Sequence, residues 1–269
     1  MDHFLRTIKN VIIFILISHL SLYVFANPLR PDQKPKYTNA NSAEAKKAEL
    51  EVVKWPKPNK FHTAIQFSNS RIDGFQISNN TKGTLVSEIN MAFSIQYFNW
   101  LKKEYDFSVG LNLENISMME ETNSIPIDNS KVMAIGLNTM GRYLLYENVY
   151  IKGILGFQDK LFYAPNTLLT GYEINKPMVP YFGTGFSILL AEFKKIKLGF
   201  DLTLSLYQSA AAGSSSANSG QGYEIKLFSM WPRGTEQIVS EFFYHSRIQN
   251  TQLIRTQEQK IGLGVGYQF

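Results

Sequence analysis

The residues of this chain that most resemble catalytic machinery are His245 and Ser246, a possible general base beside a nucleophile. Adjacent residues of a β-strand point to opposite faces, so the two side chains diverge if they lie on a strand. Glu224 is a second acid–base candidate, because pairing of its segment with that of His245 brings the two close together. His245 and Glu224 are thus weak catalytic candidates, and no zinc-type ligand spacing accompanies them, so no metal or cofactor is expected.

The elements that carry these residues are indicated by a period-two alternation of apolar and polar residues from Phe61 onward. On the second segment of this pattern, Leu85 is expected on the apolar face together with Met91 and Phe93. Residues 71–78 extend the first segment outward. Turn signals divide the pattern into ten segments, at about 61–68, 85–97, 105–114, 133–145, 149–157, 179–191, 196–207, 223–231, 238–247 and 260–269.

The connections between these segments distinguish a membrane barrel from a soluble β-sandwich, which also alternates. Four are tight and three are long, as expected for short periplasmic turns and longer extracellular loops, and aromatic residues gather near the segment ends. The prediction is an all-β transmembrane antiparallel up-and-down barrel of about ten strands, with eight as the alternative. The tight connections are 98–104, 146–148, 192–195 and 232–235, and the long ones are 116–130, 162–178 and 208–222.

The last segment alternates without a break from Ile261 to Phe269, with Tyr267 two residues before the terminal aromatic. A strand that crosses a bilayer obliquely needs about nine to eleven residues. This segment resembles the C-terminal strand of Gram-negative outer-membrane β-barrels. The resemblance implies that Tyr267 and Phe269 form the signal read by the barrel-assembly machinery, and that the cell outer membrane is the destination.

The first sixty residues divide into two parts. Residues 1–26 have a basic start, an apolar run and a small-residue site between Ala26 and Asn27, which is typical of a cleaved signal peptide; an uncleaved anchor is the alternative. Residues 27–60 form a Pro- and Lys-rich periplasmic leader, either a flexible tether or a partly helical segment that plugs the barrel or touches a partner. Residues 61–269 are the barrel.

Composition limits the function further. The chain has no cysteine, which excludes disulfides and a lipoprotein thioether anchor. The formal net charge is +5, but residues 61–269 hold 17 basic and 17 acidic residues, so the excess lies in the first sixty. A barrel without net charge is not a nucleic-acid-binding surface.

The polar faces of the segments are expected to turn inward and to carry acids and bases that pair across neighbouring strands, with Lys226 opposite Glu241. Such a network either fills the lumen or lines a narrow ion or solute path. Apolar residues in the long loops either cover the barrel mouth or form a contact surface. The predicted lumen network is Glu88, Asp106, Glu114, Arg142, Lys152, Asp201, Glu224, Lys226, Glu241, Arg247 and Lys260.

Three families of outer-membrane enzymes test the alternative that the protein is a hydrolase. Outer-membrane phospholipases and lipid A deacylases typically carry His-x-Ser, whereas residue 247 here is Arg, and omptin proteases carry Asp-x-His, whereas residue 243 is Phe. Both departures favour a non-enzymatic role: membrane structure, surface recognition through loops, or a narrow channel. The expected partners are outer-membrane lipid and lipopolysaccharide, with the assembly machinery during biogenesis, and the barrel is expected to be a monomer.

Overall fold

A computed structural model describes residues 55, 60–76, 82–100, 104–120, 127–128, 131–165, 172–193, 195–212, 215–251 and 254–269. They belong to one compact unit, Val52–Phe269. The predicted signal peptide, its cleavage site and almost all of the leader lie outside the described residues. No helix within the described part of the chain is long and apolar enough to cross a membrane.

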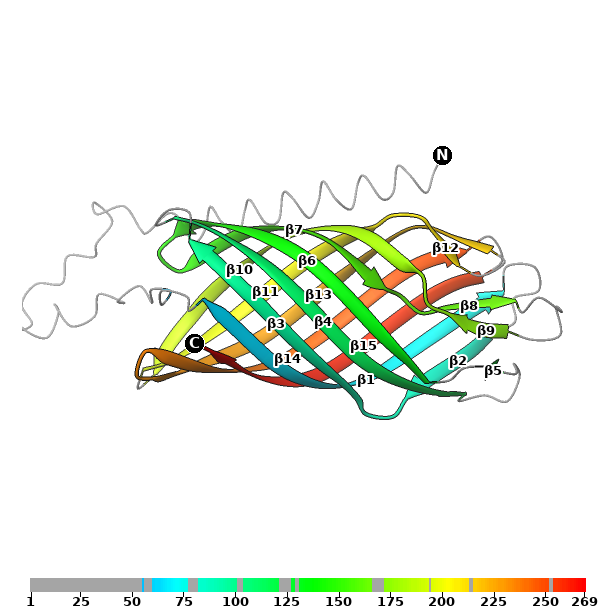
Figure 1. Ribbon diagram of the computed structural model, residues 1–269, viewed down its shortest axis with the longest axis horizontal. Coiled ribbons are helices and arrows are strands. Elements are labelled where there is room, and N and C mark those ends of the chain that lie inside the picture. The colour runs from blue at the N-terminus through cyan, green and yellow to red at the C-terminus, as the bar shows by residue number, and fades with distance from the viewer. Residues whose placement is uncertain are drawn as a thin grey trace, which may run out of the picture. The chain divides into compact units, whose positions relative to one another are not determined.

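The described residues form one closed ring of antiparallel strands (Figure 1). Neighbours pair in the order β1, β3, β4, β6, β7, β10, β11, β13, β14 and β15, and β15 pairs back to β1. Within the described residues, the barrel wall therefore has ten strands, as predicted. The elements are β1 Phe61–Gln76, β2 Lys82–Ser87, β3 Asn90–Trp100, β4 Tyr105–Glu120, β5 Ile127–Asp128, β6 Lys131–Tyr146, β7 Val149–Asp159, β8 Phe162–Pro165, β9 Tyr172–Asn175, β10 Met178–Phe193, β11 Ile196–Tyr207, β12 Ala210–Ala212, β13 Ser215–Arg233, β14 Glu236–Thr251 and β15 Ile254–Gln268.

The two ends of the barrel differ. At one end, called the turn end, adjacent strands are joined by tight connections such as 147–148 and 234–235, and the chain finishes there (Figure 1). At the other, called the loop end, the connections carry the short strands β5, β8, β9 and β12. The predicted tight connections are confirmed at the turn end, whereas at the loop end β14 ends at Thr251 and β15 begins at Ile254, so the alternation of tight and long connections holds only in part.

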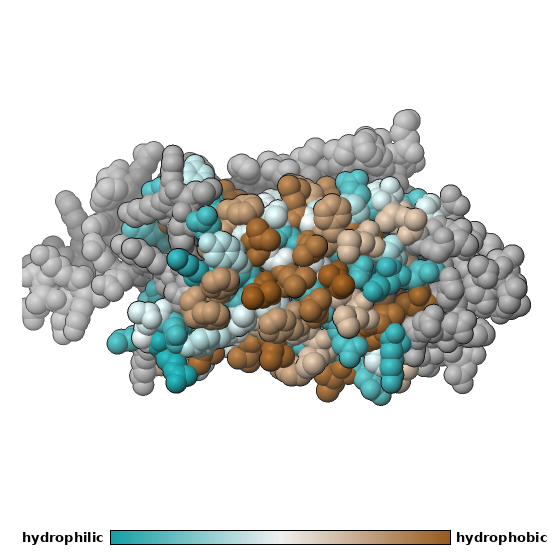
Figure 2. Space-filling model, viewed as in Figure 1, coloured by the Kyte–Doolittle hydropathy of each residue, from teal (hydrophilic) through white to brown (hydrophobic). Residues whose placement is uncertain are grey.

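The apolar face of each strand points outward. Leu155, Leu263 and Val265 are each 60% or 61% exposed, whereas Asp106 and Glu114 are buried inside. On the face seen in Figure 2, apolar side chains form a belt over the middle of the barrel, with hydrophilic residues toward both ends. A protein in water arranges these groups the other way round, so this surface suits hydrocarbon, where a closed barrel satisfies every backbone hydrogen bond.

An irregularity between β2 and β3 corrects one prediction. Ser68 of β1 pairs with Asn90, and Ile72 of β1 pairs with Leu85. The stretch from Leu85 to Asn90 therefore has one residue more than the stretch from Ser68 to Ile72 that it faces. An extra residue of this kind reverses the alternation beyond it. Leu85 is consequently buried inside the barrel, and its expected place on the outer face is wrong.

The third long connection is also shorter than predicted. Much of 208–222 is strand, because β12 pairs with the start of β13 and Ala217 is fully buried. The described wall therefore continues beyond the apolar belt at this side of the loop end.

Candidate functional site: the barrel lumen

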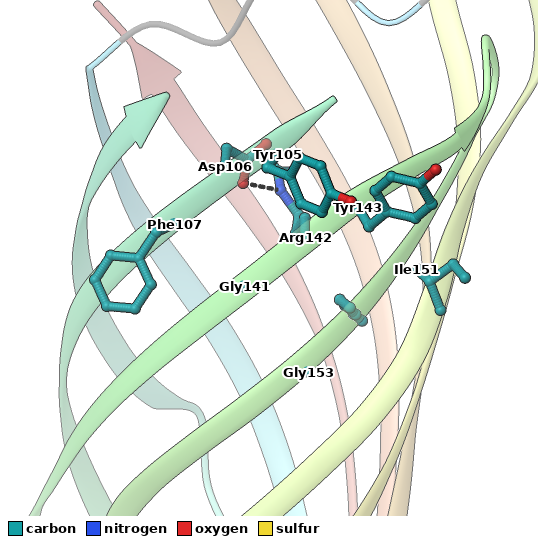
Figure 3. A pocket seen from close by; sticks show the side chains of 9 residues that line it. Tyr105, Asp106, Phe107, Gly141, Arg142, Tyr143, Ile151 and Gly153 are labelled. Atoms are coloured by element: carbon teal, nitrogen blue, oxygen red, sulfur yellow. Dashed lines mark hydrogen bonds and ion pairs between the residues drawn. The ribbon is translucent and has the colours of Figure 1, made fainter. Parts of the chain in front are cut away.

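Charged side chains in the lumen are paired across the barrel. Arg142 donates from Nε and Nη2 to the two carboxylate oxygens of Asp106, at 2.7 and 2.9 Å (Figure 3). Its guanidinium also lies over the rings of Phe98 and Tyr150. A bidentate pair of this kind fixes the geometry of both side chains. It ties β4 to β6 near the turn end.

A second pair spans an intervening strand. Lys152 of β7 donates to Asp201 of β11 at 2.5 Å, and Ser187 of β10 donates to the same carboxylate. Gly185 is the residue of β10 opposite Lys152, whereas Asp201 lies opposite Ser187, two residues further along β10. Since glycine has no side chain, the lysine can reach over β10 to the acid two strands away.

The ion pair that spans the most strands joins Lys260 of β15 to Glu114 of β4, with β1 and β3 lying between them in the wall. Ser70, the residue of β1 opposite Lys260, is small and buried. A pair that skips two wall strands must cross the interior of the barrel. The pair therefore bridges part of the interior at this level.

Glu241 and Lys226 are brought together, but not in the predicted register. Lys226 lies opposite Phe243, so its ammonium meets Glu241 on the diagonal at 3.8 Å and Glu224 of its own strand at 3.2 Å. Gln66 of β1 donates to the same Glu241 carboxylate. The expected direct Lys226–Glu241 pairing is corrected to this diagonal contact.

Among the described charged residues, Arg247 is the most completely enclosed, with 1% exposure. It donates to Glu258 at 2.8 Å, to Gln249 at 2.9 Å and to the main-chain carbonyl of Leu161 at 2.9 Å. Its guanidinium also lies over the ring of Phe162. It thus binds the connection after β7 to the opposite wall.

That connection closes the loop end. Leu161, Phe162 and Ile174 are buried, and β8 contacts β13 and β15 although it follows β7 in sequence. An apolar layer fills the mouth of the barrel here. Its members are Ile72, Leu85, Ile116, Met118, Ala134, Leu161, Ile174 and Ile254, with a second group of Phe162, Val179, Tyr207 and Ala217.

A smaller apolar layer lies inside the turn end. Leu189, Met230 and Val239 are buried together, and Trp55 packs against this group with Phe228. Trp55 also meets Tyr150 edge to face at 5.2 Å, and its main-chain N–H donates to the carbonyl of Glu147. The last part of the predicted leader thus contributes a side chain to the lumen.

The weak catalytic candidates face each other without forming a catalytic arrangement. Glu224 is directly opposite His245, but its carboxylate is engaged by Lys226, and the buried Nε2 of His245 has no hydrogen-bond partner among the described residues. Ser246 lies on the other face of β14, as predicted. Within the described part of the chain, no cluster of three or more His, Cys, Asp or Glu side chains could hold a metal ion.

One predicted lumen residue is misplaced and several were missed. Glu88 lies in the bend between β2 and β3 with an exposed side chain, apart from the buried pairs. Glu258, the partner of Arg247, was overlooked although it lies on the polar face two residues before Lys260. Leu161 and Phe162 lie at the edge of a segment assigned to a loop, where no periodic signal marks them as interior.

A closed antiparallel ring with an apolar exterior and a charged, filled interior defines a transmembrane β-barrel of the outer-membrane type. No known family model matches the chain, and no curated protein matches it either.

Solved structures with a similar fold are outer-membrane barrels. An outer membrane channel from Pseudomonas putida F1 is 8% identical, with 80% of this chain and 97% of that chain covered and a TM-score of 0.46. The outer membrane protease OmpT from Escherichia coli is 9% identical, with 79% and 98% covered and a TM-score of 0.40. The β domain of the Bordetella autotransporter BrkA is 10% identical, with 78% and 99% covered and a TM-score of 0.41.

Proposed function

We propose that the protein is an integral outer-membrane barrel with a sealed lumen and a non-enzymatic role, in which the barrel is a membrane scaffold that presents its loop end for surface recognition. The observation that carries this is the Lys260–Glu114 pair, which crosses the interior between two apolar layers. The pair places two charged side chains in the interior, in space that an open pore would leave to water. Breaking a buried pair by removing one partner is costly, so the arrangement resists opening.

The same proposal includes the export, insertion and orientation of the barrel. An N-terminal signal peptide exports the chain, the assembly machinery inserts it as a monomer, and the turn end faces the periplasm. The loop end then lies on the cell surface, next to lipopolysaccharide. The apolar belt of Figure 2 supports contact with lipid around the middle of the barrel.

Planar-bilayer recording of the refolded protein tests the sealed lumen. The expected result is a bilayer without stable nanosiemens steps. Trp55→Ala removes one side chain that packs against the turn-end layer, and it should leave the bilayer equally silent because the loop-end layer and the Lys260–Glu114 pair remain; Trp231→Ala, at an exposed outer position, is the control. Large stable steps from the unmodified protein would overturn the proposal in favour of a channel.

A second candidate is a hydrolase acting on lipid or peptide, favoured by the direct Glu224–His245 register and by the unpartnered Nε2 of His245. The test compares His245→Ala with His62→Ala, the other inward histidine whose Nε2 is buried without a partner. Phospholipid and peptide cleavage are measured on both, after heat-modifiable migration has shown that each has folded. Cleavage by the unmodified protein that only His245→Ala abolishes would favour the hydrolase.

A further inference from the structure

A shallow groove of about 410 Å³ lies on the outer wall where β4, β6 and β7 run side by side (Figure 3). Its floor is formed by Gly141 and Gly153, which pair directly across β6 and β7. Phe107 stands on one side of this floor and Ile151 on the other. The groove is therefore a recess in the apolar belt.

The two glycines, Gly141 and Gly153, leave unoccupied volume above the outer surface of β6 and β7. A Cβ added to either Gly141 or Gly153 would meet nothing within 4 Å, whereas one at Gly185 would clash with main-chain atoms. The alternation of the strands turns Gly185 and the other described strand glycines toward the lumen. The recess is thus made where the only outward-facing strand glycines of the described chain lie next to each other.

One end of the groove is aromatic. Tyr105, the first residue of β4, and Tyr143 of β6 pair with their ring centroids 4.8 Å apart and close the groove toward the turn end. Tyrosine is enriched where the hydrocarbon of a bilayer meets the headgroups. The groove consequently runs from that interface into the level of the acyl chains.

The charged residues near the groove are not available to a ligand. Asp106 and Arg142 are paired with each other, and Lys152 is paired with Asp201 inside the barrel. What the groove offers is an apolar floor and walls of Phe107, Ile151 and two tyrosine rings. Its described lining residues offer apolar contacts to a hydrocarbon chain, and the cations among them, Arg142 and Lys152, are already paired.

We propose that this groove binds one acyl chain of a membrane phospholipid from the leaflet at the turn end, independently of headgroup charge. Acyl chains are the medium that surrounds this part of the belt, so the occupant is present wherever the barrel is inserted. A chain in the recess fills space that protein side chains leave empty and gains contacts on three sides. The inference goes beyond the proposed scaffold role and stands whether or not the lumen conducts.

The test measures retained lipid by native mass spectrometry of the full mature protein in detergent, titrated with dioleoyl phosphatidylcholine or dioleoyl phosphatidylglycerol. The unmodified protein should hold one lipid of either kind. Gly141→Leu combined with Gly153→Leu should lower that adduct at least fivefold, because leucine side chains occupy the groove. Val265→Leu, which adds bulk to an exposed outer position on β15, should leave it unchanged.

Heat-modifiable migration shows whether each variant has folded, and Gly141→Ala with Gly153→Ala provides a milder filling that should give an intermediate loss. Equal lipid retention by the unmodified protein and the double leucine variant would overturn the proposal. So would retention of phosphatidylglycerol alone, which would indicate headgroup recognition. A dimer that the leucine variant abolishes without any change in lipid would assign the groove to a second copy of the chain instead.

Discussion

The guanidinium of Arg247 and the main-chain carbonyl of Leu161 are joined by a hydrogen bond of 2.9 Å, although the two residues belong to opposite sides of the barrel. This contact fastens the connection after β7 inside the mouth. The same arginine is held by Glu258, so a buried ion pair and a loop anchor depend on one side chain.

Replacing Arg247 by alanine should destabilise the barrel by about 3–5 kcal/mol, because the Glu258 carboxylate is left buried without its partner. Urea unfolding of the protein in lipid vesicles, followed by tryptophan fluorescence, measures the change in the free energy of unfolding. Arg255→Ala, an exposed position on the neighbouring strand, is the control and should change it little. Equal midpoints for the two variants would contradict the anchoring role of Arg247.

Lys260 and Glu114 should show strong energetic coupling across the lumen. Lys260→Met alone leaves a buried carboxylate unpaired and should cost about 3–5 kcal/mol. Adding Glu114→Gln removes the uncompensated charge, so the double variant should be less destabilised than the sum of the two single changes. Simple additivity in the same unfolding assay would mean that the pair does not bridge the interior.

Two glycines on adjacent strands should respond oppositely to alanine. A Cβ at Gly185 would lie 1.9 Å from the carbonyl oxygen of Leu202, so Gly185→Ala forces the main chain to shift and should cost at least about 1–3 kcal/mol. Gly153→Ala meets nothing within 4 Å and should be neutral or slightly stabilising. Equal urea midpoints for Gly185→Ala and Gly153→Ala would show that β10 tolerates a side chain at position 185, next to the path of Lys152.

Deleting Phe269 should slow insertion and lower the yield of folded barrel. Its main-chain N–H and carbonyl both pair with Phe61, and the two rings stack with their centroids 5.7 Å apart. The deletion therefore removes the contacts at the turn end of the seam between the first and last strands. The heat-modifiable fraction after refolding into vesicles is the readout, with Val265→Ala as a control on the same strand. An unchanged folded fraction would argue that Phe269 does not contribute to closure of the barrel.

The wall of the barrel could be predicted from sequence because alternation alone decides which side chains face lipid. The prediction from alternation was wrong at Leu85, because one extra residue between β2 and β3 reverses which side chains face inward and which face outward. It also put Lys226 opposite Glu241, since the length of a turn does not fix a register to the nearest residue pair.

The interior could be predicted less well than the wall. Asp106, Arg142 and Asp201 were recognised because each interrupts an apolar strand with a charge. Leu161 and Trp55 were not recognised as lumen residues, since nothing local distinguishes an apolar side chain that folds into a barrel from one that touches lipid or a partner. Only the long-range packing of the connection after β7 reveals its place.

The seam between β1 and β15 joins Thr63 to Tyr267, two positions near opposite limits of the barrel sequence. Ring closure must therefore wait until all the other strands have been made and delivered, and contacts of such large separation form slowly. An interrupted polypeptide would be left as an open sheet with two bare edges, exposed to proteases and to aggregation. Closure of the cylinder therefore depends on the presence of the last strand as well as the first.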